Sequence, residues 1–301
     1  MSKKNVIIAF SSDEFFVDIY KELKKNDILV KILITETAKP SGRGLKITSN
    51  PAYNFAFENF LKIYTPEKFD NGFIAKLTGE VSKLKEDFNV IGLVFAYGKI
   101  IPQIIIDLFN DKIINIHPSL LEKYRGPSPI QQAILNGDKT TGYSIIKISK
   151  KMDAGDIIDS KKIEINSNDN CKSLRKKILN KALGNLPDII DNFSKGKVKY
   201  IKQSEKKATY SKIIKKSDAQ ITLKDNFKTA FGKIRAYHLW PKAFFIILDK
   251  RFIIHDAKIK DDKLVILKIQ IENKKIISAK EFSNGYKNLL TYFPKYVKFT
   301  P

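Results

Sequence analysis

At 301 residues, with 43% hydrophobic and 11% aromatic side chains, the chain can build packed cores, which excludes wholesale disorder and favours two domains. No apolar run approaches the roughly 20 residues that span a bilayer, and the start, Met-Ser-Lys-Lys-Asn, shows no signal-peptide pattern. The single cysteine, Cys171, excludes an internal disulfide and suits a reducing compartment, so we expect a cytoplasmic protein that has no contact with a membrane.

Positive charge is concentrated in the last third of the chain. Residues 201–301 carry 23 Lys and Arg against 9 Asp and Glu, a net charge of +14, whereas residues 1–200 carry a net charge of +9. Such asymmetry is typical of a protein with a polyanionic partner such as a nucleic acid. A lysine-rich solvated surface is the alternative interpretation.

The first 35 residues predict a βαβ unit. An apolar strand over residues 4–10 is followed by Ser11, Ser12 and Asp13, which signal the start of a helix to about residue 25, and then by a strand over residues 28–35. This order implies a parallel sheet. Because no Gly-x-Gly-x-x-Gly follows the first strand, a dinucleotide cofactor is not indicated.

A basic loop follows, in which two glycines flank Arg43. Residues 37–46 have no core pattern and read Thr-Ala-Lys-Pro-Ser-Gly-Arg-Gly-Leu-Lys. The loop is either an ordinary surface connection or a hairpin-like arm that presents Arg43 and Lys46 to phosphate.

Two strands are expected to end side by side further along the chain. Helices over residues 51–60 and 71–86 precede a strand over residues 90–95, which stops at Ala96, Tyr97 and Gly98 before a short helix that opens at Pro102. The next strand spans residues 113–117. Ligands of open α/β sheets bind beyond the carboxyl ends of the strands, so both strand ends are expected at one crevice.

Asn115 and His117 stand at the end of this second strand. They lie two residues apart and therefore leave an extended strand by the same face. An amide donor and a titratable imidazole at a strand end are well placed to bind a reacting carbonyl, and we hypothesise that they form a catalytic centre.

An acidic turn is the candidate partner of that centre. A helix over residues 128–136 precedes a predicted β pair, residues 141–149 and 157–165, and the turn between the two strands reads Lys-Lys-Met-Asp-Ala-Gly-Asp. Its Asp153 comes 36 residues after His117 and is expected to return to the same sheet edge. Asp beside Gly is also a common turn former, which is the simpler reading.

The last third changes in texture. A long amphipathic helix over residues 171–193 leads into a charged connector, residues 195–207. Short β-like runs then surround one helix over residues 225–237, which suggests a small barrel of the oligonucleotide-binding kind. The runs are residues 209–214, 220–223, 243–248, 252–259, 264–271 and 275–278.

The expected fold class is therefore α/β: an open, mostly parallel, Rossmann-like sheet domain followed by a small C-terminal OB-like β-barrel domain. We predict a catalytic domain over residues 1–194, a linker over residues 195–207 and a C-terminal domain over residues 208–301.

Six motifs occur in order with sensible spacings. They are Lys-Pro-Ser-Gly-Arg-Gly from residue 39, Ala-Tyr-Gly from residue 96, Asn-Ile-His-Pro-Ser-Leu-Leu-Glu-Lys-Tyr-Arg-Gly from residue 115, Met-Asp-Ala-Gly-Asp from residue 152, Ala-Thr-Tyr from residue 208, and Ile-Arg-Ala-Tyr-x-x-Trp-Pro from residue 234. With them the chain resembles the methionyl-tRNA formyltransferase family over nearly its whole length. Two places depart from the family pattern: Ser11 and Ser12 replace a glycine-rich turn, and Glu122 replaces a proline.

The resemblance implies transfer of a formyl group from 10-formyltetrahydrofolate to methionyl initiator tRNA, with Asn115, His117 and Asp153 as the catalytic residues. Asn115 and His117 would stabilise an oxyanion, and Asp153 would keep His117 charged and oriented and accept the amine proton. The resemblance also implies two groups of binding residues. The folate pocket would be lined by Ala96, Tyr97, Gly98, Ser119, Leu120, Leu121 and Glu122, and the tRNA would be contacted by Arg43, Lys46 and the basic C-terminal domain.

We expect a monomer. We also expect no metal site, because one Cys and three scattered His offer no zinc-binding pattern. The alternatives are a related formyltransferase that acts on a small amine, such as a ribonucleotide or a nucleotide-linked amino sugar, and a formyl-folate hydrolase. A non-catalytic RNA-binding protein is the alternative from a different class.

Overall fold

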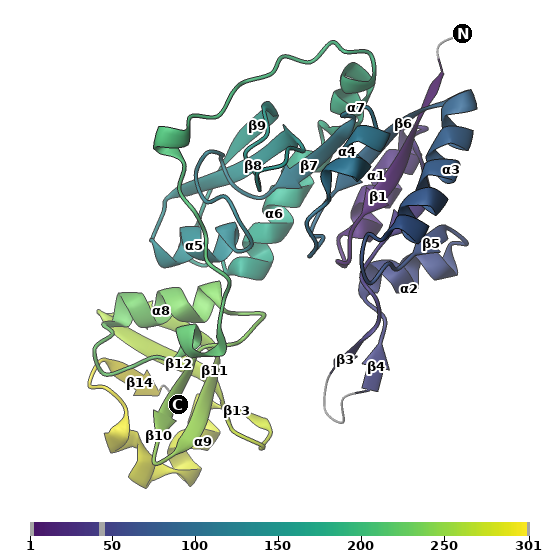
Figure 1. Cartoon of the computed structure of the whole chain (residues 1–301). Helices are drawn as coiled ribbons and strands as arrows, with labels where there is room; N and C mark the ends of the chain where they lie inside the picture. Colours follow the sequence, from purple (N-terminus) through teal and green to yellow (C-terminus); the bar gives the residue numbers. More distant parts are fainter. Residues whose placement is uncertain (1–2, 42–45, 300–301) are drawn as a thin grey trace. The chain divides into compact units, whose positions relative to one another are not determined.

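A seven-stranded sheet organises the first part of the chain in the computed structural model, which describes residues 3–41 and 46–299. The strands lie in the order β5-β2-β1-β6-β7-β8-β9. Their bounds are β1 Lys4–Phe10, β2 Leu29–Ile34, β5 Lys62–Tyr64, β6 Phe88–Val94, β7 Ile113–His117, β8 Thr140–Lys147 and β9 Ile157–Glu164. The pairs from β5 to β7 are parallel, and β8 pairs antiparallel with β7. The prediction of an open, mostly parallel sheet is confirmed (Figure 1).

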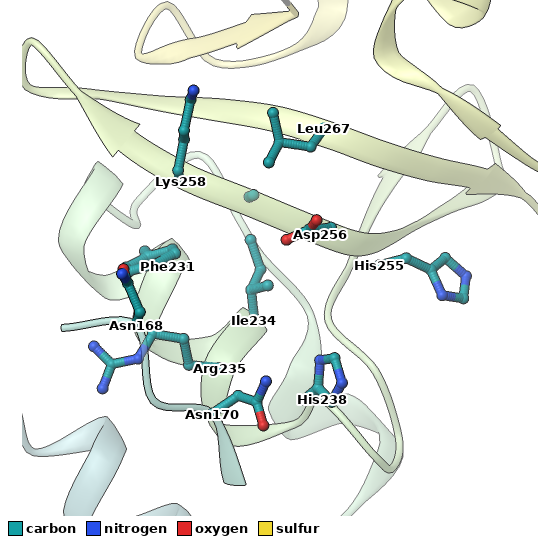
Figure 2. Close-up of a pocket in the computed structure, with 11 residues that line it drawn as sticks. Asn168, Asn170, Phe231, Ile234, Arg235, His238, His255, Asp256, Lys258 and Leu267 are labelled. Atoms are coloured by element: carbon teal, nitrogen blue, oxygen red, sulfur yellow. The ribbon is translucent and has the colours of Figure 1, made fainter. Parts of the chain in front are cut away.

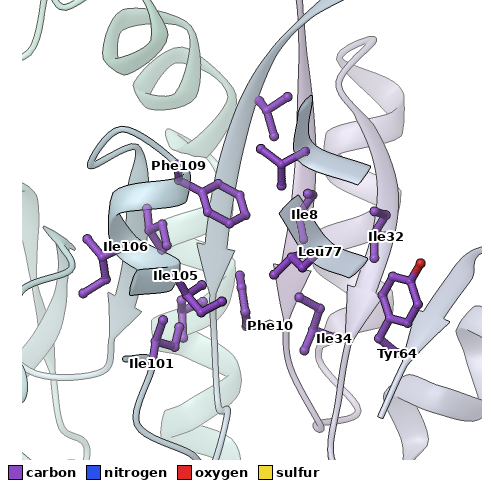
Figure 3. Packing of buried hydrophobic residues seen from close by; sticks show 14 of the residues in the cluster. Ile8, Phe10, Ile32, Ile34, Tyr64, Leu77, Ile101, Ile105, Ile106 and Phe109 are labelled. Carbon is purple, nitrogen blue, oxygen red and sulfur yellow. The ribbon is translucent and has the colours of Figure 1, made fainter. Parts of the chain in front are cut away.

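Helices cover both faces of this sheet. Their bounds are α1 Phe16–Lys25, α2 Pro51–Glu58, α3 Asn71–Asp87, α4 Gln103–Leu108 and α7 Leu186–Ser194. Side chains of β1 alternate between the faces, and Val6, Ile8 and Phe10 pack with residues of α3 and α4 in one buried cluster (Figure 3). The other face is covered by α1 and α7, which contact each other. Each fully buried Ile or Phe stabilises such a core by about 1.5–3 kcal/mol.

The strand order reverses between β1 and β6, which is where ligands bind in folds of this kind. Gly92 allows β7 to pack close to β6, since a Cβ at Gly92 would lie 2.8 Å from Ile113 Cγ1. Val94 is thereby paired with Asn115. The turn after β6 and the polar end of β7 therefore lie on neighbouring strands, as predicted.

The helix predicted over residues 171–193 was wrong as one element. It is two helices, α6 Cys171–Leu183 and α7 Leu186–Ser194. Gly184 follows the end of α6, and Pro187 lies in the first turn of α7. A proline is tolerated there because its missing N–H would have no partner in the helix, whereas inside one long helix it would remove a hydrogen bond.

Two smaller features complete this part of the chain. The basic loop is a hairpin of β3 Lys39–Ser41 and β4 Lys46–Thr48, paired antiparallel, as the hairpin-like prediction anticipated. The short edge strand β5 was not predicted. No helix among the described residues combines the length and the apolarity needed to cross a membrane.

The last part of the chain forms a curled five-stranded sheet with the order β10-β11-β12-β13, in which β14 pairs with β12. The bounds are β10 Phe244–Ile247, β11 Lys250–Lys260, β12 Lys263–Ile271, β13 Ile276–Ser278 and β14 Val297–Phe299, with α8 Phe227–Ala236 and α9 Ala279–Gly285. Short 3-10 turns span Glu205–Lys207, Lys216–Ala219 and Lys287–Tyr292. The fold-class prediction of a small C-terminal OB-like β-barrel domain is confirmed in the form of a curled sheet, a half-barrel.

Several local predictions in this part were wrong. Residues 209–214 form no strand, and residues 220–223 make only a single bridge, Gln220 to Phe244. Strand β14 and helix α9 were missed. Phe282 of α9 and Phe293 are buried against Phe252. Helix α9 and the residues after it therefore pack on the sheet through its aromatic core.

Contacts divide the chain into two compact units. One comprises Met1–Arg125, Gly142–Lys162 and Ile178–Thr209, and the other comprises Gly126–Thr141, Ile163–Lys177 and Tyr210–Pro301. Helix α5 Pro129–Leu135 packs on α8 within the second unit. The predicted linear domain boundaries stay a prediction.

Candidate active site

Asn115 and His117 meet Asp153 at the carboxyl end of β7. Asn115 Nδ2 donates to Asp153 Oδ1 at 3.4 Å, and His117 Nδ1 lies 3.5 Å from Asp153 Oδ2. The side chains of His117 and Asp153 are only 4% and 13% exposed, so the two groups meet in a largely dry environment where electrostatic interactions are strong. The structure brings the three residues predicted as catalytic into direct contact.

A backbone carbonyl holds the second ring nitrogen of His117. The Nε2 atom lies 3.0 Å from Tyr124 O, and since a carbonyl oxygen only accepts, Nε2 carries the hydrogen in this bond. Nδ1 is therefore the ring nitrogen that faces Asp153 and can interact with a substrate.

The Asp153 turn is held in an uncommon backbone conformation. Asp153 has a φ of 51°, in the left-handed region that Asp tolerates better than most residues. A Cβ at Gly155 would lie 1.7 Å from Lys147 O, so only glycine fits against the end of β8. Both readings of this acidic sequence therefore hold: it is a tight turn, and the turn directs Asp153 to His117.

The predicted folate segment after His117 is tied to β8. Ser144 Oγ accepts from Leu121 N at 2.9 Å and donates to Ser119 O at 2.8 Å. Leu120 lies over Gly142, where a Cβ would come 2.6 Å from Leu120 Cδ2. The carboxylate of Glu122, at the position that departs from the family pattern, accepts a hydrogen bond from Ser204 N.

The other predicted folate segment follows β6. Ala96 and Gly98 are exposed, whereas the ring of Tyr97 packs edge-on against Phe10 with centroids 5.8 Å apart. The buried Tyr97 hydroxyl has no hydrogen-bond partner among the described residues. Burial raises the pKa of this phenol, and the negative charge of Glu36 adds to the effect.

The serines that replace the glycine-rich turn have different environments. Ser12 Oγ lies 3.1 Å from Thr35 Oγ1 and accepts from Glu36 N at 3.0 Å, which joins the ends of β1 and β2. The Ser11 side chain is 2% exposed, and its hydroxyl has no partner among the described residues.

Of the residues predicted to contact tRNA, Arg43 lies outside the described residues. The backbone of Lys46 begins β4 and pairs with Ser41.

Two residues of the site were missed from the sequence. Tyr124 lies within the motif that contains His117, but nothing in a pattern shows that its carbonyl turns back to the imidazole. Gln203 lies in the charged connector, and its amide donates to the carbonyls of Asp153 and Gly155. Neither contact has a sequence signal, because the first depends on how the chain turns between His117 and Tyr124 and the second on how segments 50 residues apart pack.

A separate cavity of about 240 Å³ lies in the second unit (Figure 2). Its lining includes Arg235, His238, His255, Asp256 and Lys258. Burial lowers the pKa of both histidines. Within residues 3–41 and 46–299, no group of three or more His, Cys, Asp or Glu side chains is arranged to hold a metal ion.

Comparison with known proteins agrees with the site chemistry. Residues 3–190 match the family model described as formyl transferase, and residues 213–264 match that of the formyl transferase C-terminal domain. The methionyl-tRNA formyltransferase of Sulfurihydrogenibium sp. (strain YO3AOP1) is 34% identical over 306 residues, covering 93% of this chain and 97% of that protein. The chain belongs to the methionyl-tRNA formyltransferase family. A second member, from Buchnera aphidicola subsp. Schizaphis graminum, is 37% identical over 257 residues, covering 85% of this chain and 80% of that protein.

Solved structures share the fold of this family member at low identity. HypX from Aquifex aeolicus in complex with tetrahydrofolic acid has a TM-score of 0.63 and 16% identity, over 94% of this chain and 47% of HypX. The N-formyltransferase from Helicobacter canadensis, in complex with folinic acid and dTDP-3-aminofucose, has a TM-score of 0.60 and 20% identity, over 91% of this chain and 98% of that one. These likenesses show the fold alone.

Proposed function

We propose that this chain transfers the formyl group of 10-formyltetrahydrofolate to the α-amino group of methionyl initiator tRNA, for translation initiation. The observation that carries the proposal is 34% identity over 93% of the chain to a methionyl-tRNA formyltransferase. The contact of Asn115, His117 and Asp153 supports it, because these groups supply what formyl transfer requires.

The reaction needs donors for the formyl oxygen. When the amine nitrogen attacks the formyl carbon, the carbonyl oxygen gains negative charge. Asn115 Nδ2 and a protonated His117 Nδ1 both approach the Asp153 carboxylate and can donate to that oxygen. His117 Nε2 is occupied by Tyr124 O, which keeps the ring oriented during the reaction. Each such donor typically contributes about 10²–10³ in rate.

The reaction must also move one proton. The attacking amine loses a proton as its bond to the formyl carbon forms, and the bond from that carbon to N10 of the folate breaks. Asp153 accepts the amine proton directly or through a water, and N10 takes up a proton as it leaves. The products are the formylated amine and tetrahydrofolate, so atoms and charge balance.

Folate is the formyl-donor co-substrate in this proposal. The segments at residues 96–98 and 119–122 follow β6 and β7 and flank the strand ends that hold the trio.

The tRNA would be held by charge. Arg43 and Lys46 on the β3–β4 hairpin are proposed to reach the acceptor end, and the C-terminal region, with its net charge of +14, is proposed to contact phosphates. We also propose that the protein acts as a monomer in the cytoplasm.

Formylation assays test the proposal directly. Purified protein is incubated with 10-formyltetrahydrofolate and either initiator or elongator methionyl-tRNA. We expect rapid formylation of the initiator tRNA and slow formylation of the elongator tRNA. No product with either tRNA, together with turnover on a small amine or release of formate, would reject the proposed function in favour of the alternatives.

A further inference from the structure

We propose that Gln203, in the connector after α7, is a positioning residue that holds Asp153 against His117. The proposal rests on the formyl-transfer function above and identifies the side chain that orients its proton-accepting group.

The amide of Gln203 binds the Asp153 turn on both sides. Gln203 Nε2 donates to Asp153 O at 2.9 Å and to Gly155 O at 2.7 Å. The two carbonyls flank Ala154, so one side chain ties both ends of the bend. Because Asp153 has a φ of 51°, which most L-residues avoid, the turn depends on such outside bonds to keep its shape.

A buried arginine fixes the orientation of this amide. Gln203 Oε1 accepts from Arg125 Nε at 3.0 Å. If the amide were flipped, its NH₂ group would face the arginine, which has only donors, and its oxygen would face two carbonyls. Arg125 is 0% exposed, and its Nη1 donates to Glu205 Oε1 at 2.7 Å, so the guanidinium is itself held in place.

Thr209, two residues beyond this connector, holds the segment that orients His117. Tyr124 N donates to Thr209 Oγ1 at 2.9 Å, and Arg125 N donates to Thr209 O at 2.8 Å. Tyr124 O in turn accepts from His117 Nε2. The connector and the residues just beyond it therefore act on both partners: Gln203 holds the backbone that carries the carboxylate, and Thr209 holds the backbone that binds the imidazole.

Anchors on either side of Gln203 keep the connector in register. Before it, Ile201 and Ile157 exchange backbone hydrogen bonds of 2.8 and 2.9 Å. After it, Ser204 N donates to the Glu122 carboxylate. Because the backbone on both sides of Gln203 is held, its side chain can keep the Asp153 turn in one position.

The consequence concerns catalysis more than binding. Asp153 must stay near His117 Nδ1 to act on the reacting atoms, and a misplacement of about 1 Å can cost about 100-fold in rate. Gln203 itself need not contact either substrate for this effect. Loss of its two donors should therefore lower kcat and leave the KM values for folate and tRNA nearly unchanged.

Steady-state kinetics of the full chain test this with two variants. Gln203→Ala removes the amide, and Gln203→Glu keeps its shape and its acceptor toward Arg125 but has no hydrogens for the two carbonyls. We expect both to lower kcat by about 10–100-fold with KM values within about twofold of the wild type. Gln103→Ala is the matched control, since Gln103 is exposed on α4 and its amide donates to Asp107 one turn away.

A double-mutant cycle separates positioning from general stabilisation. In the Asp153→Asn background, Gln203→Ala should lower kcat by less than about threefold further, because its effect passes through Asp153. Equal losses in both backgrounds, or a Gln203→Glu variant with full kcat, would overturn the proposal. A rate loss explained by unfolding at the assay temperature, seen as a large fall in Tm, would also overturn it. If the wild type does not formylate methionyl-tRNA, the proposed function itself fails; an active wild type with fully active Gln203 variants rejects only the positioning role.

Discussion

The end of β7 and the C-terminal curled sheet use polar residues in opposite ways. At β7, three side chains meet within 3.5 Å, and the histidine is 4% exposed. In residues 201–301, a net charge of +14 is spread over a surface on which lysines such as Lys258 are exposed. The contrast indicates that the chemistry depends on the exact placement of a few groups, whereas the proposed tRNA contact depends on summed charge and tolerates the loss of one group.

The largest effect is expected from His117→Ala. Loss of the imidazole removes a proposed donor to the formyl oxygen and leaves Asp153 without its imidazole partner. We expect kcat to fall by roughly 10³-fold, with the Kd for tRNA unchanged in a filter-binding assay. His255→Ala, in the cavity of the C-terminal unit, is the control and should keep kcat. Turnover of the His117 variant within tenfold of the wild type would remove this residue from the mechanism.

A smaller effect is expected from Arg43→Ala. This arginine belongs to the basic segment of the sequence that we propose reaches the tRNA, so its loss should raise the KM for initiator tRNA by about tenfold while the KM for 10-formyltetrahydrofolate stays the same. Initial rates measured against each substrate in turn check this. An equal rise in both KM values would contradict a role confined to tRNA.

Removal of a single C-terminal charge should matter less. Lys258→Gln takes one exposed cation from the cavity lining. We expect a loss of tRNA affinity of a few-fold and a salt dependence, measured as log Kd against log salt, that is shallower by about one unit. Lys21→Gln, an exposed lysine on α1, should change neither quantity. A tenfold or larger fall in kcat for Lys258→Gln would contradict the view that the C-terminal charges contribute to tRNA binding and not to catalysis.

The smallest effect is expected on stability, at Asp225 of the C-terminal unit, whose side chain is about as buried as that of Asp153. Asp225 pairs with Lys233 at 2.9 Å, with side chains 10% and 18% exposed. Burial alone would raise the pKa of Asp225, but hydrogen bonds from Thr222 and Lys233 outweigh it and lower this pKa.

Because the pKa of Asp225 is lower in the folded state, its stabilisation is present above the unfolded value of about 3.9 and is lost as the pH falls through the folded value. Asp225→Asn should therefore lower the free energy of unfolding by about 1–2 kcal/mol at pH 7, and the difference from wild type should shrink below about pH 4. Urea unfolding at pH 7, 5 and 3.5 measures this. A difference that stays constant with pH would show that the ion pair contributes nothing.

Local patterns predicted much of the first sheet. Strand β1 and helix α3 follow from apolar runs and start signals, and β7 follows from an apolar strand that ends in polar residues. The contact of Asp153 with His117 was also predicted, because a β pair that returns to the same edge brings its turn there. The roles of these residues stay proposals.

Other features depended on contacts that a pattern does not encode. The break between α6 and α7 follows from Gly184 and Pro187, yet the amphipathic pattern of residues 171–193 runs through it. Helix α9 and β14 form because Phe282 and Phe299 complete an aromatic core, with ring centroids 5.0 Å apart.

The sequence by itself determined the fold class, the family and the three residues proposed for catalysis, since strand and helix periodicity and motif spacing are local properties of the chain. Only the tertiary structure decided which nitrogen of His117 faces Asp153 and which side chain holds the Asp153 turn. Tyr124 O is hydrogen-bonded to Nε2 of His117. Gln203, 50 residues beyond Asp153, donates two hydrogen bonds to the Asp153 turn. The physical reason is that a hydrogen bond depends on distance and direction between atoms, and for segments far apart in the chain these are set by packing.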